Sequence, residues 1–473
     1  MSDLTTQVQA HRKSELEMVF NDKHTENGDD SNISTGNHLV DLLFRGEYYT
    51  KHLREVTIGN SEVEKLFAMF VRDPRHGLKY RDYGRVLMRQ AGVSAENVAL
   101  AGRLDDLWEN PVSGELNMEW VKFLFDQCKD GNELAKKWMP HYQAKEDGKP
   151  TKSTIMAAKF RRMLGMNKQA YGKFVKCNTV ESKLSSHRND DIDFSKLPSL
   201  ALIKYWARFA GTSKTNPKTD MAERFQAYLD SVKKGESKMN MSTASVYDIY
   251  RNADKINADI AFAQIEKISG SWLPIVDTSG SMFWKESNDA ISKALAVAHY
   301  LAKCSTYAPN KVVSFSSCPK LIELGVTLPP FDTTCKLPKE NGTVYNREIR
   351  SMYTGDCSNT DFGAVMKCLS KLTTDFPDYL VVLTDGEFDE GSNSANRHTL
   401  MMWRRNGIKT KMVWWNFNPR NTTSPEVIRQ GEDGSIFISG YNPQILKFLN
   451  CGFDAEIFLA TLLSEYKKAI GQD

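Results

Sequence analysis

The sequence lacks the features that mark membrane, secreted and zinc-binding proteins. No apolar run reaches the eighteen or so residues of a membrane span, and the polar stretch 1–30 is not a secretory signal. The eight cysteines include no C-x-x-C pair, and no histidine pair completes a zinc-site pattern. We therefore expect a cytoplasmic protein with reduced thiols and no membrane partner.

Motifs of the common enzyme classes are also missing. There is no G-x-S-x-G or H-E-x-x-H segment, and no cysteine has an obvious histidine partner. Gly148-Lys-Pro-Thr151 is not a phosphate-binding loop, because the upstream glycine is absent and proline replaces the hydroxyl residue. We therefore expect that the protein is not an enzyme.

Charge is nearly balanced over the 473 residues, at +3, but it is unevenly distributed. Residues 150–240 carry 18 Lys and Arg against 8 Asp and Glu, residues 1–149 carry 20 against 25, and residues 270–473 carry 21 against 22. A basic middle segment indicates a polyanionic partner, but the solvated face of Lys-rich helices has the same composition. Charge alone leaves both interpretations open.

Residues 37–268 are predicted to be helical. Ser61-Glu-Val-Glu64 is a capping box, and Val63, Leu66, Phe67 and Phe70 recur at helical spacing. Further segments with helical periodicity cover residues 98–108, 120–125, 201–209 and 225–232. Many short amphipathic helices are typical of an all-α, HEAT-like solenoid or ring. The polar residues 1–36 are expected to form a disordered arm.

The pattern changes at Ser269, where short apolar runs begin to alternate with helical segments. The runs cover residues 272–276, 311–315, 379–383, 410–415 and 435–438. This alternation predicts a doubly wound, Rossmann-like α/β domain over residues 269–473, which makes the chain multidomain. Pro274 lies in a run that should be a central strand, so we expect the strand to begin at Ile275 or to contain a bulge.

Oxygen-bearing side chains follow the predicted strands, at the edge where ligands bind in such sheets. Asp277 and the serines of Asp277-Thr-Ser-Gly-Ser281 follow the first run, Asp385 follows the third, and Thr360 begins a helix. Mg²⁺ prefers six oxygen ligands and usually keeps some water, so one position could accept an acidic oxygen from a partner. The pattern therefore predicts a Mg²⁺ site formed by Asp277, Ser279, Ser281, Thr360 and Asp385.

Basic residues fall in two places that suit a nucleic acid. In the turn between two predicted helices, Arg72, Arg75 and Lys79 could contact phosphates or could pair with neighbouring carboxylates, and residue chemistry favours pairing. Further along, the predicted RNA-binding residues are Arg161, Arg162, Lys168, Lys173, Lys176, Arg188, Lys204 and Arg208. Tyr171, Phe174, Tyr205 and Trp206 are interleaved with them and could stack on bases, although helical spacing favours core packing for Phe174 and Trp206.

The metal motif, its flanking strand and helix, and the two later elements resemble a von Willebrand A domain with a metal-ion-dependent adhesion site. The charged turn, the helices and then this domain resemble the Ro (TROVE-type) architecture. They are closer still to a poorly characterised Ro-like family of phages, large viruses and plants. Typical segments are Phe160-Arg-Arg-Met-Leu-Gly165, Val180-Glu-Ser-Lys183 and Ile192-Asp-Phe-Ser-Lys-Leu-Pro-Ser199.

The resemblance implies that the helical ring binds RNA as part of a ribonucleoprotein. It also implies that the A domain captures a protein partner through Mg²⁺. We expect a monomer. A second hypothesis is a metal-dependent protein adaptor or assembly component that captures an acidic residue of its partner and binds no RNA.

Overall fold

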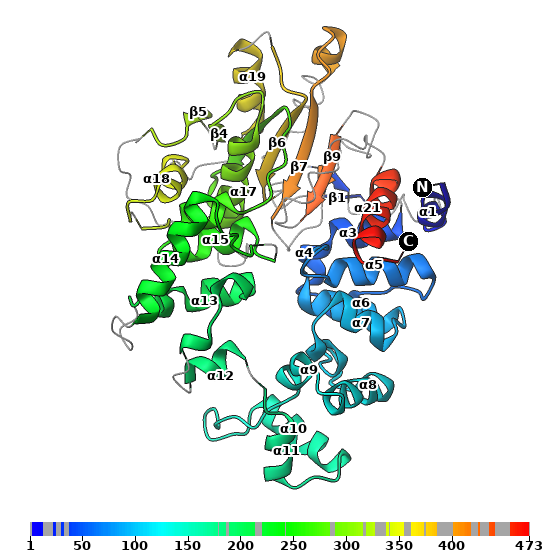
Figure 1. The fold of residues 1–473 in the computed structure, drawn as a ribbon. Helices are drawn as coiled ribbons and strands as arrows, with labels where there is room; N and C mark the ends of the chain where they lie inside the picture. Colours follow the sequence, from blue (N-terminus) through cyan, green and yellow to red (C-terminus); the bar gives the residue numbers. More distant parts are fainter. Residues whose placement is uncertain are drawn as a thin grey trace. The chain divides into compact units, whose positions relative to one another are not determined.

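The structure is a computed structural model, and it divides the chain into two compact units. Residues 1–52 and 194–465 form one unit, and residues 53–193 and 466–473 form the other (Figure 1). The structure describes residues 2–12, 22–24, 30–32, 37–177, 179–185, 189–212, 220–241, 243–283, 289–315, 318–326, 337–339, 341–353, 361–372, 375–385, 401–417, 424–425, 435–439 and 455–472. Within these ranges no helix is long and apolar enough to cross a membrane.

The first unit is built on a six-stranded sheet with the order β5-β4-β3-β6-β7-β9 (Figure 1). All neighbouring strands are parallel except β4 and β5. The strands are β3 (Trp272–Asp277), β4 (Lys311–Phe315), β5 (Lys320–Glu323), β6 (Tyr379–Thr384), β7 (Lys411–Asn416) and β9 (Ser435–Ser439). The five predicted strands are confirmed to within a residue or two at each end. The edge strand β5 was not predicted, because its sequence is short and mostly exposed.

Helices cover both faces of this sheet. On one face α17 (Ala290–Cys304) packs against β3, and Trp272 Nε1 donates to the Leu301 carbonyl at 2.8 Å. On the other face, Leu273 and Val313 lie near α19 (Phe362–Leu372). A parallel strand between two helical layers is covered on both faces. All six residues of β3 are accordingly buried, and most of them are apolar.

Pro274 lies inside β3, which begins at Trp272 and not at Ile275. β3 pairs with β6 from Trp272 onward, so Pro274 is opposite Val381. Pairing with β4 begins only at Ile275. Only one of the two ladders therefore runs past the proline, and the strand can remain central.

Helices before residue 269 also belong to this unit. They are α13 (Ser199–Phe209), α14 (Asp220–Lys234), α15 (Val246–Asn252) and α16 (Ala258–Ala263). The Tyr247 hydroxyl donates to Asp289 Oδ2 at 2.5 Å, directly before α17. Asp259 accepts backbone N–H groups at the start of α18 (Val344–Ser351). The expected boundary after residue 268 marks the change from helices to strands, but the compact units divide elsewhere.

Parts of the N-terminal arm that we expected to be disordered are ordered. They are α1 (Ser2–Gln9), β1 (Asp22–His24) and β2 (Asp30–Asn32), and β2 pairs with β8 (Ser424–Pro425). Val8 is fully buried, and Arg12 forms a 2.7 Å ion pair with Glu456 of α21 (Ala455–Ala469). Asn37, before α3 (His38–Phe44) and α4 (Gly46–Tyr49), donates to Glu456 and to the Val8 carbonyl. The polar composition predicted disorder. It could not show that β8 and Glu456, hundreds of residues away, hold this segment in place.

The second unit is helical, as predicted. Its elements are η1 (Leu53–Glu55), α5 (Glu62–Arg72), α6 (Arg81–Gln90), α7 (Ala95–Ala101), η2 (Leu104–Leu107), α8 (Met118–Lys129), α9 (Glu133–Trp138), α10 (Lys152–Met163), α11 (Lys168–Phe174), α12 (Val180–Ser185) and η3 (Asn189–Asp191); η4 (Phe194–Lys196) follows in the first unit. The capping box at Ser61 is present, and the four apolar residues predicted to share a face of α5 are buried. The C-terminal residues join this unit, where the Tyr466 ring packs edge-on against Phe70 at 5.5 Å. The HEAT-like ring stays a prediction.

Candidate functional site

The structure brings together four of the five predicted metal ligands. β3 and β6 are adjacent and parallel, so the residues at their carboxyl ends lie side by side. Asp277 is the last residue of β3, and Asp385 directly follows β6. Both carboxylates are fully buried, Ser279 is nearly so, and Ser281 is half-buried in η5 (Gly280–Phe283). The fifth predicted ligand, Thr360, lies outside the described residues.

Hydrogen bonds fix the Asp277 carboxylate in this site. Its Oδ1 accepts the Ser279 backbone N–H at 2.9 Å, and its Oδ2 accepts the Thr384 hydroxyl at 2.7 Å. The Thr278 N–H donates to the Phe315 carbonyl at 2.8 Å and ties the turn to β4. Sequence reasoning missed Thr384. A hydroxyl residue one position before Asp385, in register with the end of β3, was the available signal.

The side chains present fit a hard cation. Ser279 Oγ and Ser281 Oγ are 3.2 Å apart. Neighbouring oxygens around Mg²⁺ are separated by about 2.9 Å when each lies about 2.0–2.1 Å from the ion. Within the described ranges no three His, Cys, Asp or Glu side chains are grouped to hold a metal. A cation here would therefore depend on the two serine hydroxyls together with the two aspartates.

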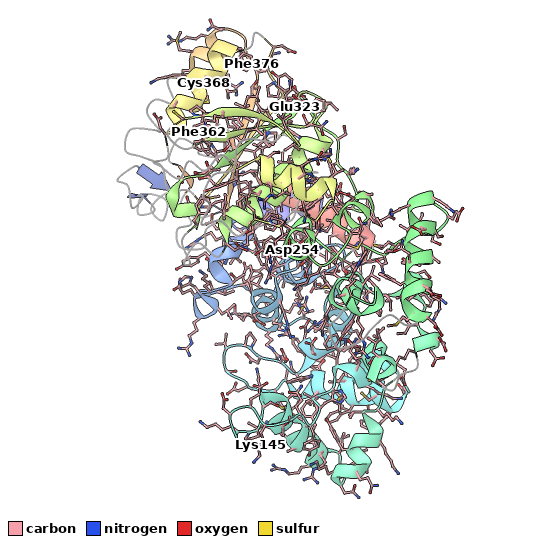
Figure 2. All side chains as sticks on the ribbon, turned by 90° about the vertical axis from the view of Figure 1, so that its left-hand side faces the viewer. Lys145, Asp254, Glu323, Phe362, Cys368 and Phe376 are labelled. Atoms are coloured by element: carbon pink, nitrogen blue, oxygen red, sulfur yellow. The ribbon has the colours of Figure 1, made fainter. Side chains whose placement is uncertain are left out.

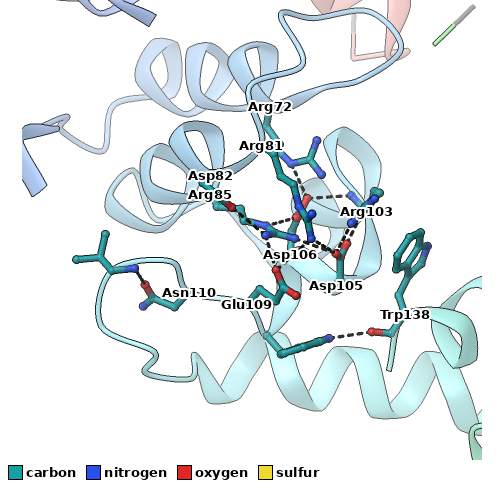
Figure 3. Close-up of polar contacts among 12 residues, drawn as sticks. Arg72, Arg81, Asp82, Arg85, Arg103, Asp105, Asp106, Glu109, Asn110 and Trp138 are labelled. Atoms are coloured by element: carbon teal, nitrogen blue, oxygen red, sulfur yellow. Dashed lines mark hydrogen bonds and ion pairs between the residues drawn. The ribbon is translucent and has the colours of Figure 1, made fainter. Parts of the chain in front are cut away.

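The charged turn predicted between helices contributes to an ionic cluster in the second unit, and the centre of this cluster is buried (Figure 3). Its arginines are Arg72, Arg81, Arg85 and Arg103, and its acids are Asp82, Asp105, Asp106 and Glu109. Arg72 Nε lies 2.8 Å from Asp106 Oδ2, with both side chains buried. Arg72 is therefore not accessible to a phosphate here, which agrees with the structural role that residue chemistry favoured.

Close approach of α5 and α6 makes this cluster possible. A Cβ atom added at Gly84 would lie 2.6 Å from Arg72 Cβ, so only glycine fits at this crossing. Arg85, one residue later, pairs with Asp106 at 2.5 Å and Asp105 at 2.9 Å and also contacts Glu109. These three acids come from the segment around η2, which sequence reasoning did not assign to the turn.

Charge pairing in the cluster shifts several pKa values. Burial alone lowers the Arg85 pKa, but Asp106, Asp105 and Glu109 together raise it above its ordinary value. Burial raises the Asp105 pKa, yet Arg103, Arg85 and Arg81 lower it overall. Arg89 is outside the cluster, and burial together with the charge of Arg85 lowers its pKa to about 10. The charge pairing thus favours the charged forms of Arg85 and Asp105.

The other predicted basic residues of this turn are more accessible. Arg75 is exposed, and its backbone N–H donates to Asp73 Oδ1. Lys79 is half-buried with a φ of 70°. A positive φ is uncommon for lysine, so the backbone at Lys79 is locally strained.

Helices α10 and α11 carry the largest group of predicted RNA-binding residues. Arg162, Lys168 and Lys173 are exposed, and so is Lys176, which follows α11. Arg161 is half-buried, and its guanidinium donates to the Met166 carbonyl at 3.1 Å. The preceding loop, where Lys145 is labelled in Figure 2, is also exposed. These two helices therefore present cations to solvent. Among the described residues, these cations form no ion pairs with acidic side chains.

The remaining predicted residues belong elsewhere. Lys204 and Arg208 lie on α13 of the first unit, exposed and half-buried respectively. Arg188 is outside the described residues. Tyr171 and Trp206 are buried, and the Tyr171 hydroxyl donates to the Pro140 carbonyl at 2.8 Å. Phe174 and Tyr205 are half-buried. Core packing is confirmed for Trp206, and Tyr171 also packs inside.

Comparison with known proteins adds a viral relative. The chain matches no protein-family model. It is 24% identical over 385 residues to an uncharacterized protein of Acanthamoeba polyphaga mimivirus, and this match covers 74% of the chain and 64% of that protein. The crystal structure of the Deinococcus radiodurans Ro (RSR) protein aligns over 92% of this chain and 88% of that chain, with a TM-score of 0.36 and 13% identity. An alignment at this TM-score does not establish a common fold.

Proposed function

We propose that the protein is a Ro-like RNA-binding scaffold whose α10–α11 surface contacts RNA phosphates. The observation that carries this proposal is an acid-free basic segment. From Gly148 to Val180 there is no Asp or Glu, whereas there are eight Lys and Arg. They are Lys149, Lys152, Lys159, Arg161, Arg162, Lys168, Lys173 and Lys176, and all but Arg161 are exposed.

The contrast with the ionic cluster supports this proposal. In the ionic cluster, the buried arginines Arg72 and Arg85 form ion pairs with acidic side chains. On α10 and α11, in contrast, no acidic residue is available on either helix. An unmatched row of cations attracts a polyanion and releases condensed counterions when it binds.

In the same proposal the sheet unit is a von Willebrand A-type domain that holds Mg²⁺. Asp277, Ser279, Ser281 and Asp385 would hold the ion, together with Thr360. The bound cation would supply an electrostatic contact for a carboxylate of a protein partner. The buried, hydrogen-bonded Asp277 supports this role because burial of a carboxylate is costly unless it is compensated.

Fluorescence anisotropy of a labelled short single-stranded RNA, measured with the full chain over a salt series, tests the proposal. We expect binding that weakens steeply with salt. The double variant Arg162→Gln/Lys168→Gln should reduce both the affinity and the salt slope. Lys129→Gln, which removes an exposed cation paired with Asp126 on α8, is the matched control. No binding at low salt by the folded protein would exclude an RNA scaffold.

A metal-dependent protein adaptor that binds no RNA is the second candidate. The oxygen ligands at the ends of β3 and β6 favour this candidate, because a cation that they hold could bind an acidic partner whether or not RNA binds. Asp277→Ala separates the two. If the first proposal holds, this variant keeps its RNA affinity. Loss of RNA binding in folded Asp277→Ala would contradict the assignment of RNA and metal to different surfaces.

A further inference from the structure

A pocket of about 470 Å³ opens beside the edge strand β5 of the sheet unit. Leu273 and Val313 form its floor, and α19 forms one wall (Cys368 on α19 and Glu323 on β5 are labelled in Figure 2). The pocket lies well within the range of about 300–1,000 Å³ that is typical of small-ligand sites. None of the predicted metal ligands is among the residues that line it.

One face of α19 lines the pocket. Val365, Cys368 and Leu369 follow i, i+3, i+4 spacing, so they share the helix face that lines the pocket. Val313 beneath is 5% exposed, whereas its cross-strand partner Leu321 on β5 is 55% exposed. The apolar surface of the sheet thus continues beyond the helix to the pocket rim. An apolar group placed there would be removed from water without rearrangement of the core.

The rim of the pocket carries an excess of positive charge. Lys311 and Lys320 line it, and Asp375 is the acidic residue among the lining side chains. Both lysines are exposed, and within the described residues neither ammonium forms an ion pair. Two lysines and one aspartate give the lining a net positive charge, which is complementary to a molecule with an apolar body and one anionic end.

We propose that this pocket binds an amphipathic carboxylate of the size of a medium-chain fatty acid. The alkyl chain lies between the sheet and α19, and the carboxylate faces Lys311 and Lys320. This site is independent of the proposed RNA and metal functions, because it shares no residue with either.

Fluorescence of 11-(dansylamino)undecanoic acid, titrated with the full-length protein, tests the site. We expect saturable binding that decanoate displaces and decyltrimethylammonium does not. Cys368→Trp should abolish binding because the indole fills the chamber, whereas Cys368→Ala should retain it. Lys311→Gln/Lys320→Gln should weaken binding about three- to tenfold, as expected for two solvent-exposed charge contacts.

Lys367→Gln is the matched control, because Lys367 is exposed on α19 but does not line the pocket. Circular dichroism of each variant establishes that it is folded. Unchanged binding by folded Cys368→Trp would overturn the proposal. So would absence of binding by the wild type, or a loss in Lys367→Gln equal to that in the double lysine variant.

Discussion

At the scale of single residues, buried charges in this protein are matched by partners that come from distant segments. Arg85 has a side chain only 2% exposed and pairs with acids about twenty residues away. His299 Nε2, on α17, donates to the Glu348 carboxylate of α18 at 2.7 Å, and Lys303 Nζ donates to the same carboxylate at 2.9 Å. Phe262 and Tyr345 pack edge-on against its ring. These matched sites make distinct and measurable contributions to stability.

Arg85→Leu should destabilise the helical unit by about 3–5 kcal/mol, because Asp105 and Asp106 would remain buried and each would lose an ion-pair partner. Arg81→Leu is the matched control. Arg81 pairs with Asp105 and Glu109, but its side chain is 49% exposed, so its loss should cost less than about 1 kcal/mol. Urea denaturation followed by far-ultraviolet circular dichroism gives both values. Equal losses in the two variants would show that the buried pairs are not special.

His299 should make stability depend on pH. Burial lowers its pKa despite the opposing effects of Glu348 and Asp259, and Lys303 lowers it further. The unfolded chain therefore takes up a proton near pH 6.5 that the folded state binds only at lower pH. The resulting stability is present above pH 6.5 and is lost as pH falls below it, by up to about 1.4 kcal/mol per pH unit.

Unfolding midpoints in urea, measured between pH 7.5 and 5, test this dependence. Glu348 does not titrate in this pH range. Burial raises the pKa of its carboxyl group, but His299 and Lys303 lower that pKa below its ordinary value overall. His299→Gln should flatten the profile, whereas substitution of the exposed His76 by Gln should not. An unchanged slope in His299→Gln would assign the pH dependence to other groups.

At the scale of elements, side-chain caps define where the helices begin. Asn or Ser/Thr side chains accept backbone N–H groups at the start of α7, α8, α9, α10 and α11. Asn37 has a larger role. It caps α3 through Leu39 and Val40, and it also holds Glu456 of α21 and the Val8 carbonyl. One amide thus joins three segments within the sheet unit.

Asn37→Ala should increase hydrogen exchange in α1 and α3 and destabilise the unit by about 2–3 kcal/mol, since it removes a cap and leaves buried groups unsatisfied. Asn167→Ala, which removes an exposed cap at α11, should cost about 1 kcal/mol and change exchange only in α11. Mass spectrometry of backbone exchange distinguishes the two. Unaltered exchange in α1 after Asn37→Ala would mean that the N-terminal helix is held in another way.

At the scale of the whole molecule, the predicted metal site should couple to the stability of the sheet unit. Mg²⁺ that binds only the folded state should raise the unfolding temperature, by an amount equivalent to about 1.4 kcal/mol at ten times its Kd. Asp277→Asn should remove this response. Asp361→Asn is the control, because that exposed side chain caps α19 through Ala364. Thermal scans with and without Mg²⁺ that coincide for the wild type would argue against a metal at Asp277.

The sequence by itself determined the features that depend on near neighbours. Short apolar runs predicted five strands, and hydrophobic periodicity predicted some of the helices, such as α5, α8, α13 and α14. The Ser61 capping box marked the start of α5. Asp277 and Asp385 each directly follow an apolar run, so short segments of sequence also predicted their positions at the carboxyl ends of strands. All of these depend on residues within a few positions of one another.

Only the tertiary structure decided which distant groups meet. It paired Arg72 with Asp106, placed Thr384 against Asp277, and joined Arg12 to Glu456. It also placed helices α13 to α16 with the sheet, and left open the pocket beside β5. The physical reason is that a buried charge or hydroxyl needs a partner, and the partner is whichever suitable group the fold places beside it. A local pattern of residues contains no information about which distant carboxylate, hydroxyl or guanidinium will occupy that position.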